Sequence, residues 1–330
     1  MRRRDFIAGL GSAVMCSAAA RAQQPGGLRR VGVLIPYGEN DPEGRSWLSA
    51  FTQELSRLGW TEGRNLRTDV RWAPGSIDLM RTAAKELVGL QPDVILSSST
   101  AATTAFARET QTIPIVFAIV SDPVGAGFVA GLPRPGGNIT GFISMEARMA
   151  SKWLQLLTEI APGVKRAATM FNPDMAPGGG SYYLPAFEAA ARSLKVAPIA
   201  APVHSDAEIE TVIASLGREP GGGLVLMPDN FNNVHRASII AQAARNNVPA
   251  VYFAALFARD GGLLSYGSNG PDIFRRAASY VDRILRGEKP AELPVQLPVK
   301  FEMALNANTA KALGLTVPQS ILLSADEVVE

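Results

Sequence analysis

The sequence predicts an α/β protein of two doubly wound lobes, each a parallel sheet with helices on both faces. Three observations lead to this prediction. Short apolar runs alternate with segments of helical periodicity along almost the whole chain, a pattern typical of parallel sheets. The alternation forms two series, divided by the Gly/Pro-rich stretch GLPRPGGNITG at residues 131–141. The length of 330 residues suits about two domains.

The first 22 residues are expected to be a cleaved export signal. They combine a basic start (Arg2–Arg4), an apolar stretch (Phe6–Met15) and the small-x-small site Ala20-Arg21-Ala22. Arg3-Arg4-Asp5-Phe6-Ile7 resembles the bacterial twin-arginine motif, although the general export route stays open. The apolar stretch is much shorter than the ~20 residues that a membrane span needs. We therefore expect a periplasmic protein, cleaved after about Ala22.

The charge and cysteine content of the remaining chain exclude several classes of protein. The formal net charge is +2, and the signal carries four Arg and one Asp, so its removal leaves +2 − 3 = −1. A chain without basic excess does not suit nucleic acid or an anionic membrane surface. The single cysteine, Cys16, lies inside the signal, which excludes disulfides, thiol catalysis and cysteine-ligated metals. We predict no metal site and no cofactor.

The first series of elements begins with an apolar run that Pro36 ends, the pattern of a strand buried on both faces. A helix with apolar side chains three or four apart ends at Gly59, and Ser76 is the expected cap of the next helix. Apolar and charged side chains alternate at 66–72, which predicts a half-exposed strand near the sheet edge. The predicted elements are strands at 31–35, 66–72, 93–97 and 113–120, and helices at 44–58 and 76–90.

The second series starts after the Gly/Pro-rich stretch. An apolar stripe that contains Trp153 and Ile160 predicts a helix, and the strand RAATMF follows at 166–171. Ser205 and Glu208 form the sequence signature of a capping box at the start of a later helix. Further strands are expected at 196–203, 223–228 and 249–254.

The stretch DVILSSSTAATTA at 93–105 predicts a binding site. In parallel α/β sheets, ligands bind beyond the carboxyl ends of the strands, where helix N-termini point inward. A helix that begins near Thr100 would direct free N–H groups and its positive dipole end at a ligand, and the hydroxyls of Ser98, Ser99 and Thr100 would add donors. The pattern indicates a site for a carboxylate or another anion. A hydroxyl N-cap with small packing residues remains the structural alternative.

No enzyme is predicted. A nucleophilic serine needs a base within hydrogen-bond reach, and both histidines of the chain, His204 and His235, have structural explanations at helix starts. The sequence contains no G-x-S-x-G elbow, no S-x-x-K, no H-E-x-x-H and no P-loop. One alternative is an exported oxidoreductase, since Gly125–Ala130 fits G-x-G-x-x-A and Glu146 follows at a suitable distance. Two features argue against a dinucleotide site. The glycines do not follow the strand directly, because Ser121-Asp122-Pro123 intervenes, and the stretch after them is too short for a full crossover helix.

Four segments resemble one known family, the substrate-binding proteins of ABC transporters, whose relatives include tryptophan-binding members. They are IPIVFA (113–118), DPVGAGFVAGLPRPGGNITGF (122–142), GGLLSYGSN (261–269) and KFEMALNANTAKALGLTVPQSILLSADEVVE (300–330). The resemblance implies a type I periplasmic-binding-protein fold with three crossings between the lobes. Lobe 1 would then comprise 28–144 plus 268–293, and lobe 2 would comprise 145–267 plus 294–330.

The resemblance also implies a site and partners. Ligand contacts would come from Tyr37, Ser98, Ser99, Thr100, Ala118, Asn172, Asp229, Tyr252 and Ser265. The implied protein is a soluble, monomeric periplasmic receptor that presents a small molecule, with amino acids as the best guess, to an ABC permease and its ATPase. A sensor for a signalling partner is a further alternative. Asp229 would receive a ligand ammonium group or cap a helix, and the sequence leaves both open.

Overall fold

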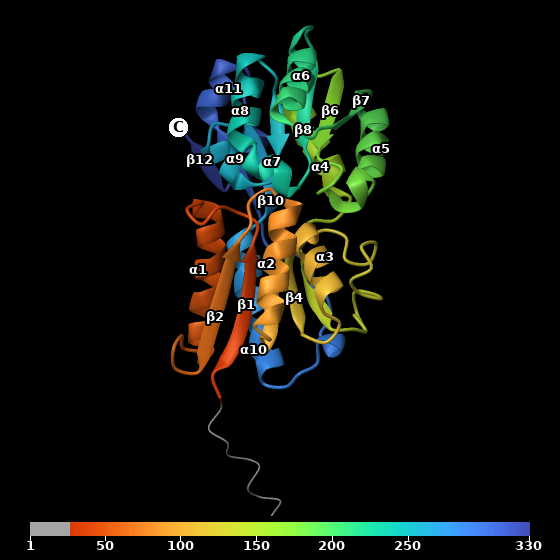
Figure 1. Cartoon of the computed structure of the whole chain (residues 1–330). Coiled ribbons are helices and arrows are strands. Elements are labelled where there is room, and N and C mark those ends of the chain that lie inside the picture. Colours follow the sequence, from red (N-terminus) through yellow and green to blue (C-terminus); the bar gives the residue numbers. More distant parts are fainter. Residues whose placement is uncertain (1–26) are drawn as a thin grey trace, which may run out of the picture.

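Two β-sheets, stacked end to end, form the framework of the protein (Figure 1). The computed structural model describes residues 27–330, so the expected export signal and Cys16 lie outside the described residues. Within residues 27–330 the first sheet has five strands in the order β2-β1-β3-β4-β5. The second sheet, counted over the same residues, has seven strands in the order β12-β11-β10-β9-β8-β6-β7.

The strands are short and separated by helices, as the sequence pattern predicts. The strands of the first sheet are β1 (Arg29–Ile35), β2 (Leu66–Trp72), β3 (Val94–Ser98), β4 (Ile115–Val120) and β5 (Ile139–Ile143). Those of the second are β6 (Arg166–Phe171), β7 (Ala197–Pro202), β8 (Gly222–Leu226), β9 (Ala250–Tyr252), β10 (Leu264–Ser268), β11 (Phe301–Asn306) and β12 (Glu327–Val329).

The helices occupy the connections between strands. The α-helices are α1 (Pro42–Arg57), α2 (Ile77–Gly89), α3 (Thr100–Glu109), α4 (Met149–Ile160), α5 (Leu184–Leu194), α6 (Asp206–Gly217), α7 (Asn230–Val234), α8 (Arg236–Arg245), α9 (Ala255–Arg259), α10 (Gly270–Leu285), α11 (Ala307–Ala312) and α12 (Gln319–Ser324). Two 3₁₀ turns within the described chain are η1 (Pro177–Gly180) and η2 (Pro290–Glu292).

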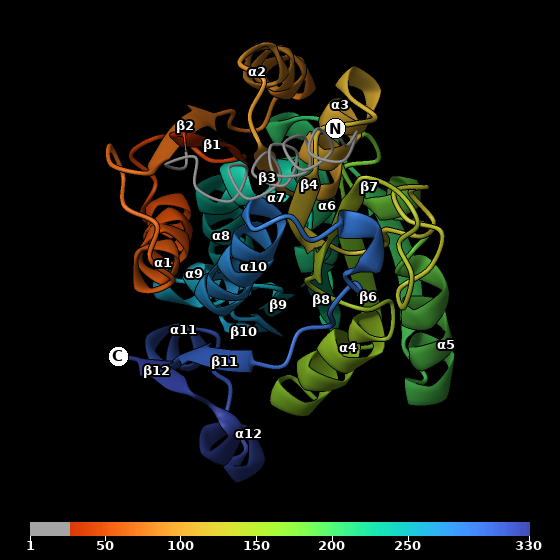
Figure 2. The same ribbon diagram turned by 90° about the horizontal axis from the view of Figure 1, so that it is seen from below.

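The first sheet is parallel throughout and covered on both faces. Helices α1 and α10 pack together over one face, and α2 and α3 pack together over the other (Figure 2). The central strands β1 and β3 are almost fully buried, which explains their continuous apolar runs. Strand β2 lies at the sheet edge and is partly exposed, so the prediction from its alternating pattern is confirmed.

The second sheet is parallel except for one pair. Strand β11 runs antiparallel to β10, and β12 is parallel to β11. Helix α4 anchors this lobe through Trp153, which is fully buried and whose Nε1 donates to the carbonyl oxygen of Tyr266 at 2.7 Å. Ser205 caps α6 as predicted, although Glu208 accepts from the N–H of His204 instead of completing the box at Ser205.

The chain crosses between the two sheets three times within the described residues. It passes from β5 to α4, from β10 to α10, and from η2 to β11. The crossings support one another, since the N–H of Ile143 donates to the carbonyl of Gln296 at 2.9 Å and the N–H of Asn269 donates to that of Lys300 at 3.1 Å. Helix α10 therefore lies in the first lobe although its sequence follows a strand of the second.

One expectation from the sequence needs correction, and one alternative loses its structural basis. The Gly/Pro-rich stretch was expected to be only a divider, but its end forms β5, the fifth strand of the first sheet. Gly125–Ala130 forms turns and begins no helix, and the Asp122 carboxylate accepts from the N–H of Gly125 at 2.8 Å. A dinucleotide site needs a helix N-terminus at this point, so the motif carries no such site.

Within residues 27–330, no helix combines the length and the apolar character that a membrane crossing requires.

Candidate functional site

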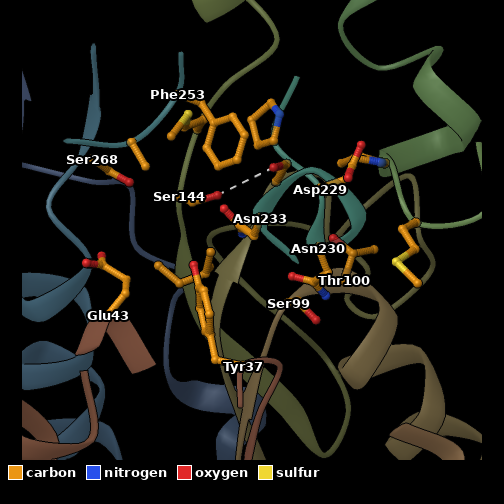
Figure 3. A pocket seen from close by; sticks show the side chains of 18 of the residues that line it. Tyr37, Glu43, Ser99, Thr100, Ser144, Asp229, Asn230, Asn233, Phe253 and Ser268 are labelled. Carbon is orange, nitrogen blue, oxygen red and sulfur yellow. Dashed lines mark hydrogen bonds between the residues drawn. The ribbon is translucent and has the colours of Figure 1, made fainter. Parts of the chain in front are cut away.

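A cavity lies between the two sheets, at the carboxyl ends of their parallel strands (Figure 3). About 640 Å³ of space, part of it open to solvent, is enclosed by residues of both lobes. The lining residues are Tyr37, Glu43, Trp47, Ser99, Thr100, Ile119, Ser121, Ser144, Met145, Met175, Pro177, Pro228, Asp229, Asn230, Asn233, Phe253, Ala254, Ser268 and Gly270.

Five helices begin at this cavity. Its wall includes the first turns or caps of α1, α3, α7, α9 and α10, from both lobes. Each helix N-terminus carries a partial positive charge and N–H groups without an acceptor inside the helix. Among the residues of the described chain that line the cavity, none is Lys, Arg or His. Backbone groups, not cationic side chains, are thus the means by which this cavity can bind an anion.

Helix α3 presents free N–H groups at this cavity. Ser99 is its N-cap, with Oγ accepting from the N–H of Ala102 at 3.2 Å. The N–H groups of Thr100 and Ala101 have no acceptor in the described part of the chain. Thr100 lines the cavity, and its Oγ1 makes no hydrogen bond within the described residues. Ser99 and Thr100 therefore have different roles. Ser99 caps the helix, whereas Thr100 is available to bind a ligand.

Two residues at this wall have strained backbone conformations. Ser99 has φ 99° and ψ 158°, a region used almost solely by glycine, and Ile119 has φ 56°, which a β-branched residue rarely adopts. The N–H of Ser99 donates to the carbonyl of Ala118 at 3.0 Å, so the two strained residues lie on bonded neighbouring segments. Such strain clusters at ligand sites because the surrounding fold must hold it.

The strain predicts opposite effects for two substitutions of Ser99. Ser99→Gly should leave the ligand-free protein at least as stable as the natural chain, because it relieves about 1–3 kcal/mol of strain and glycine caps a helix only slightly less well than serine. Ser99→Ala keeps the strain and loses the cap, so it should cost about 1 kcal/mol. Urea unfolding of the two variants measures both. Greater stability of the alanine variant would contradict the strain assignment.

Asp229 closes the second lobe's side of the cavity and is almost fully buried. Its Oδ1 accepts from the N–H of Asn232 at 2.7 Å, which caps α7, and its Oδ2 accepts from the N–H of Asn172 at 2.9 Å. Burial raises the pKa of Asp229 to about 7, although backbone hydrogen bonds from Asn232, Asn172 and Phe231 act in the opposite direction. The capping interpretation is thereby confirmed. A contact with a ligand ammonium group stays a prediction.

The raised pKa of Asp229 predicts a pH-dependent stability. Between its unfolded pKa near 4 and its folded pKa of about 7, the folded protein holds a proton that the unfolded chain has released. The contribution of Asp229 to the unfolding free energy is fully present below the unfolded pKa. It is lost as the pH rises through the folded pKa of about 7. From pH 5 to 8 the unfolding free energy of the ligand-free protein should therefore fall, by up to about 1.4 kcal/mol per pH unit. Asp229→Asn should remove this part of the slope, and an unchanged slope would contradict the assignment.

Comparison with known proteins identifies the family of the chain. Residues 44–329 match the family model described as ABC transporter substrate binding protein. The chain belongs to this family. A curated relative is the tyrosine-binding protein of Clostridioides difficile, 24% identical over 279 residues, which are 84% of this chain and 78% of the relative.

Solved structures of similar proteins show the same fold. A conserved domain protein from Vibrio cholerae superposes with a TM-score of 0.84 at 26% identity, and an ABC domain in complex with L-Trp from Streptococcus pneumonia with 0.83 at 23%. Each comparison covers 91% of this chain and 99% of the other. The prediction of a type I periplasmic-binding-protein fold is confirmed.

The structure of this substrate-binding protein brings together four of the nine predicted site residues. Tyr37, Ser99, Thr100 and Asp229 line the cavity, while the others are placed elsewhere. The Ser98 hydroxyl donates to the carbonyl of Leu34 at 2.7 Å, and that of Ser265 donates to the carbonyl of Ala304 at 3.3 Å.

The three remaining predicted residues also lie outside the cavity wall. Ala118 is fully buried within β4. Tyr252 stacks on Phe257, with the ring centroids 4.9 Å apart. The Nδ2 of Asn172 donates to the carbonyl of Val203 at 2.9 Å, so this side chain holds lobe 2 together behind Asp229.

Several wall residues were not among the predicted ligand contacts. Ile119, Ser121, Phe253, Ala254 and Ser268 each lie one to three residues beyond a position that was predicted. Glu43, Trp47 and Asn233 come from helices to which no site was assigned. The first group could be found by moving the expected strand ends, whereas the second had no signal in the sequence.

Contacts across the cavity hold the two lobes together in this substrate-binding protein. The Tyr183 hydroxyl donates to Ser121 Oγ at 2.8 Å, and both residues are buried. At the rim, Arg236 Nη1 donates to Asp41 Oδ2 at 3.0 Å. Each bond joins one lobe to the other, so the described arrangement has the lobes in contact around the cavity.

The histidines have surface roles. His204 Nδ1 lies 3.3 Å from Glu208 Oε2, and His235 Nδ1 lies 2.9 Å from Asp206 Oδ1. Neither histidine lines the cavity. Within the described chain, no three His, Cys, Asp or Glu side chains are grouped to hold a metal ion.

Proposed function

We propose that the protein is the periplasmic receptor of an ABC importer and that it binds an amino acid between its lobes. The observation that carries this proposal is the pairing of the open N-terminus of α3, in one lobe, with the Asp229 carboxylate, in the other, around a single cavity. A zwitterion supplies the two complementary charges: its carboxylate suits the N–H groups of Thr100 and Ala101, and its ammonium suits Asp229.

Similarity supports an amino acid as the ligand. The relative from Clostridioides difficile is named a tyrosine-binding protein, and one similar structure contains L-Trp. The lobes would be 28–144 plus 268–293 and 145–267 plus 294–330, and they would separate to admit the ligand and close on it. Export depends on the first 22 residues, and the permease and its ATPase are partners by analogy with the family.

The test is equilibrium binding to the processed chain. The twenty L-amino acids and their deaminated analogues are screened by thermal shift, and each binder is measured by calorimetry. An amino acid at a hundredfold its Kd should add about 2.7 kcal/mol of stability. Its deaminated analogue should bind much more weakly, because Asp229 would lose its partner. X-ray scattering should show a smaller radius of gyration with the ligand. Equal binding of both members of a pair, or no binding of any amino acid, would contradict the proposal.

A further inference from the structure

The cavity contains a second carboxylate that the zwitterion does not use. Glu43, in the first turn of α1, lines the cavity, and its Oε1 accepts from Trp47 Nε1 at 2.9 Å. Its Oε2 accepts no hydrogen bond from the described residues. Figure 3 shows Glu43 and Ser268 on one side of the cavity and Asp229 with Thr100 on the other. The two carboxylates thus serve different ends of the space.

Two further polar groups of the cavity wall have no hydrogen-bond partner among the described residues. The Tyr37 ring meets that of Trp47 edge to face at 5.0 Å, and the Tyr37 hydroxyl has no hydrogen-bond partner among the described residues. Asn233 is more than nine-tenths buried at the wall, and its Oδ1 is also without a partner in the described chain. No cationic side chain lines the cavity within residues 27–330. A buried acceptor without a donor, such as Asn233 Oδ1, costs free energy unless a ligand or water supplies the donor.

We infer that Glu43 is a specificity-determining residue that selects amino acids whose side chain ends in an N–H or O–H donor. This inference rests on the proposed function, because it needs the zwitterion to be held at Thr100 and Asp229, which points the ligand side chain towards Glu43. The ligand side chain would pass between Tyr37 and Phe253, which lie on opposite sides of the space in Figure 3. A phenol, an indole or an ammonium group at its end would bind Glu43 Oε2.

Desolvation of Glu43 favours a ligand with such a donor over a ligand with an apolar side chain. Burial raises the pKa of Glu43, and the nearby Asp41 and Glu302 carboxylates act in the same direction, whereas the Trp47 hydrogen bond and Arg259 lower it. A donor at Oε2 replaces the solvent that the ligand displaces. An apolar side chain displaces the same solvent and leaves the carboxyl group without compensation. A site built in this way rejects an analogue that lacks the donor more strongly than it rejects a change of size.

The experiment compares two ligand pairs that differ in the terminal donor. The pairs are L-tyrosine with L-phenylalanine and L-lysine with L-norleucine, and Kd is measured by calorimetry on the processed chain. In at least one pair, the member with the donor should bind tenfold or more tightly than the member without it. Glu43→Met, which keeps the length and removes the acceptor, should reduce this ratio to below about threefold by weakening only the donor-bearing ligand.

Two further variants complete the test. Glu43→Gln keeps a neutral acceptor, so it should preserve a preference for the phenol and lose a preference for the ammonium group. Glu39→Met, at an exposed position outside the cavity, is the matched control and should change neither ratio. Melting curves check that each variant is folded.

The possible failures are distinguishable. Ratios near one in both pairs, or a ratio that Glu43→Met leaves intact, would overturn the inference while the proposed function stands. If none of the four ligands binds but another amino acid without a terminal donor does, the inference is also overturned while the proposed function stands. If no amino acid binds at all, both are overturned.

Discussion

Thr100→Asp is expected to lower the affinity for an amino-acid ligand by at least about a hundredfold without destabilising the ligand-free protein. The new carboxylate stands at the first position of α3, where the partial positive charge of the helix favours it by about 0.3–1 kcal/mol. It occupies the N–H groups of Thr100 and Ala101 and repels the ligand carboxylate, each charge-assisted hydrogen bond being worth about 1.5–3 kcal/mol. Affinity and stability should therefore change in opposite directions.

Thr100→Asn is the matched control for this prediction, because it has nearly the same shape and no charge. It should weaken binding by less than about tenfold, which corresponds to one ordinary hydrogen bond. Calorimetry gives the affinities, and urea unfolding gives the stabilities. An equal loss in both variants would mean that shape, not charge, is recognised at this point. Full affinity in the Asp variant would place the ligand carboxylate elsewhere.

The fold was predictable because its signals are local and repeated. Continuous apolar runs in β1 and β3, alternation in β2 and hydroxyl caps at Ser76 and Ser205 each follow from period or capping chemistry. β5 was missed because ITGFI lies within a glycine-rich stretch, and its partner β4 is what makes it a strand. The three crossings followed only from the resemblance, since periodicity carries no information about which sheet a helix joins.

The site was predictable only to within a few residues. Side chains alternate along a strand, so an error of one residue in a strand end exchanges a wall residue for a buried one. Ala118 was predicted to contact the ligand, but its neighbour Ile119 lines the cavity instead. In the same way, Tyr252 was predicted and its neighbour Phe253 lines the cavity. The register shift between Phe117 and Val120 and the positive φ of Ile119 direct that side chain inward, and neither has a signature in the sequence.

Glu43 shows a different limit of sequence reasoning. An acidic residue in the first turn of a helix is explained by the helix dipole, so its presence in α1 suggests no function. Only the arrangement of the lobes brings this helix start opposite the α7 and α9 starts. The sequence likewise suggests no function for Asn233 on the other lobe. Its Oδ1 indicates a ligand contact only because the structure shows it buried and without a partner among the described residues.

A disulfide between the lobes is expected to trap or exclude the ligand. A Cβ built on Gly75, in the loop before α2, lies 3.3 Å from the Cβ of Val234, at the end of α7, so the pair is close to the 3.5–4.5 Å that a disulfide spans. Gly75 has φ 58°, so a cysteine there costs about 1 kcal/mol, which the fold should tolerate. Beyond Cys16, which falls in the expected signal, the sequence contains no other cysteine.

The Gly75→Cys/Val234→Cys protein should therefore exchange ligand at a normal rate when reduced and at least about a hundredfold more slowly when oxidised. The disulfide joins opposite lobes, and the lobes must separate for the ligand to exchange. Protein oxidised with ligand should retain it through dialysis, and protein oxidised without ligand should fail to bind it. Reductant should restore exchange in both samples. Each single-cysteine variant, treated with the same oxidant, controls for the substitutions, and mass spectrometry confirms the bond. Unchanged exchange across a verified disulfide would show that the ligand enters while the lobes stay together, and the closure on which the proposed function depends would then be wrong.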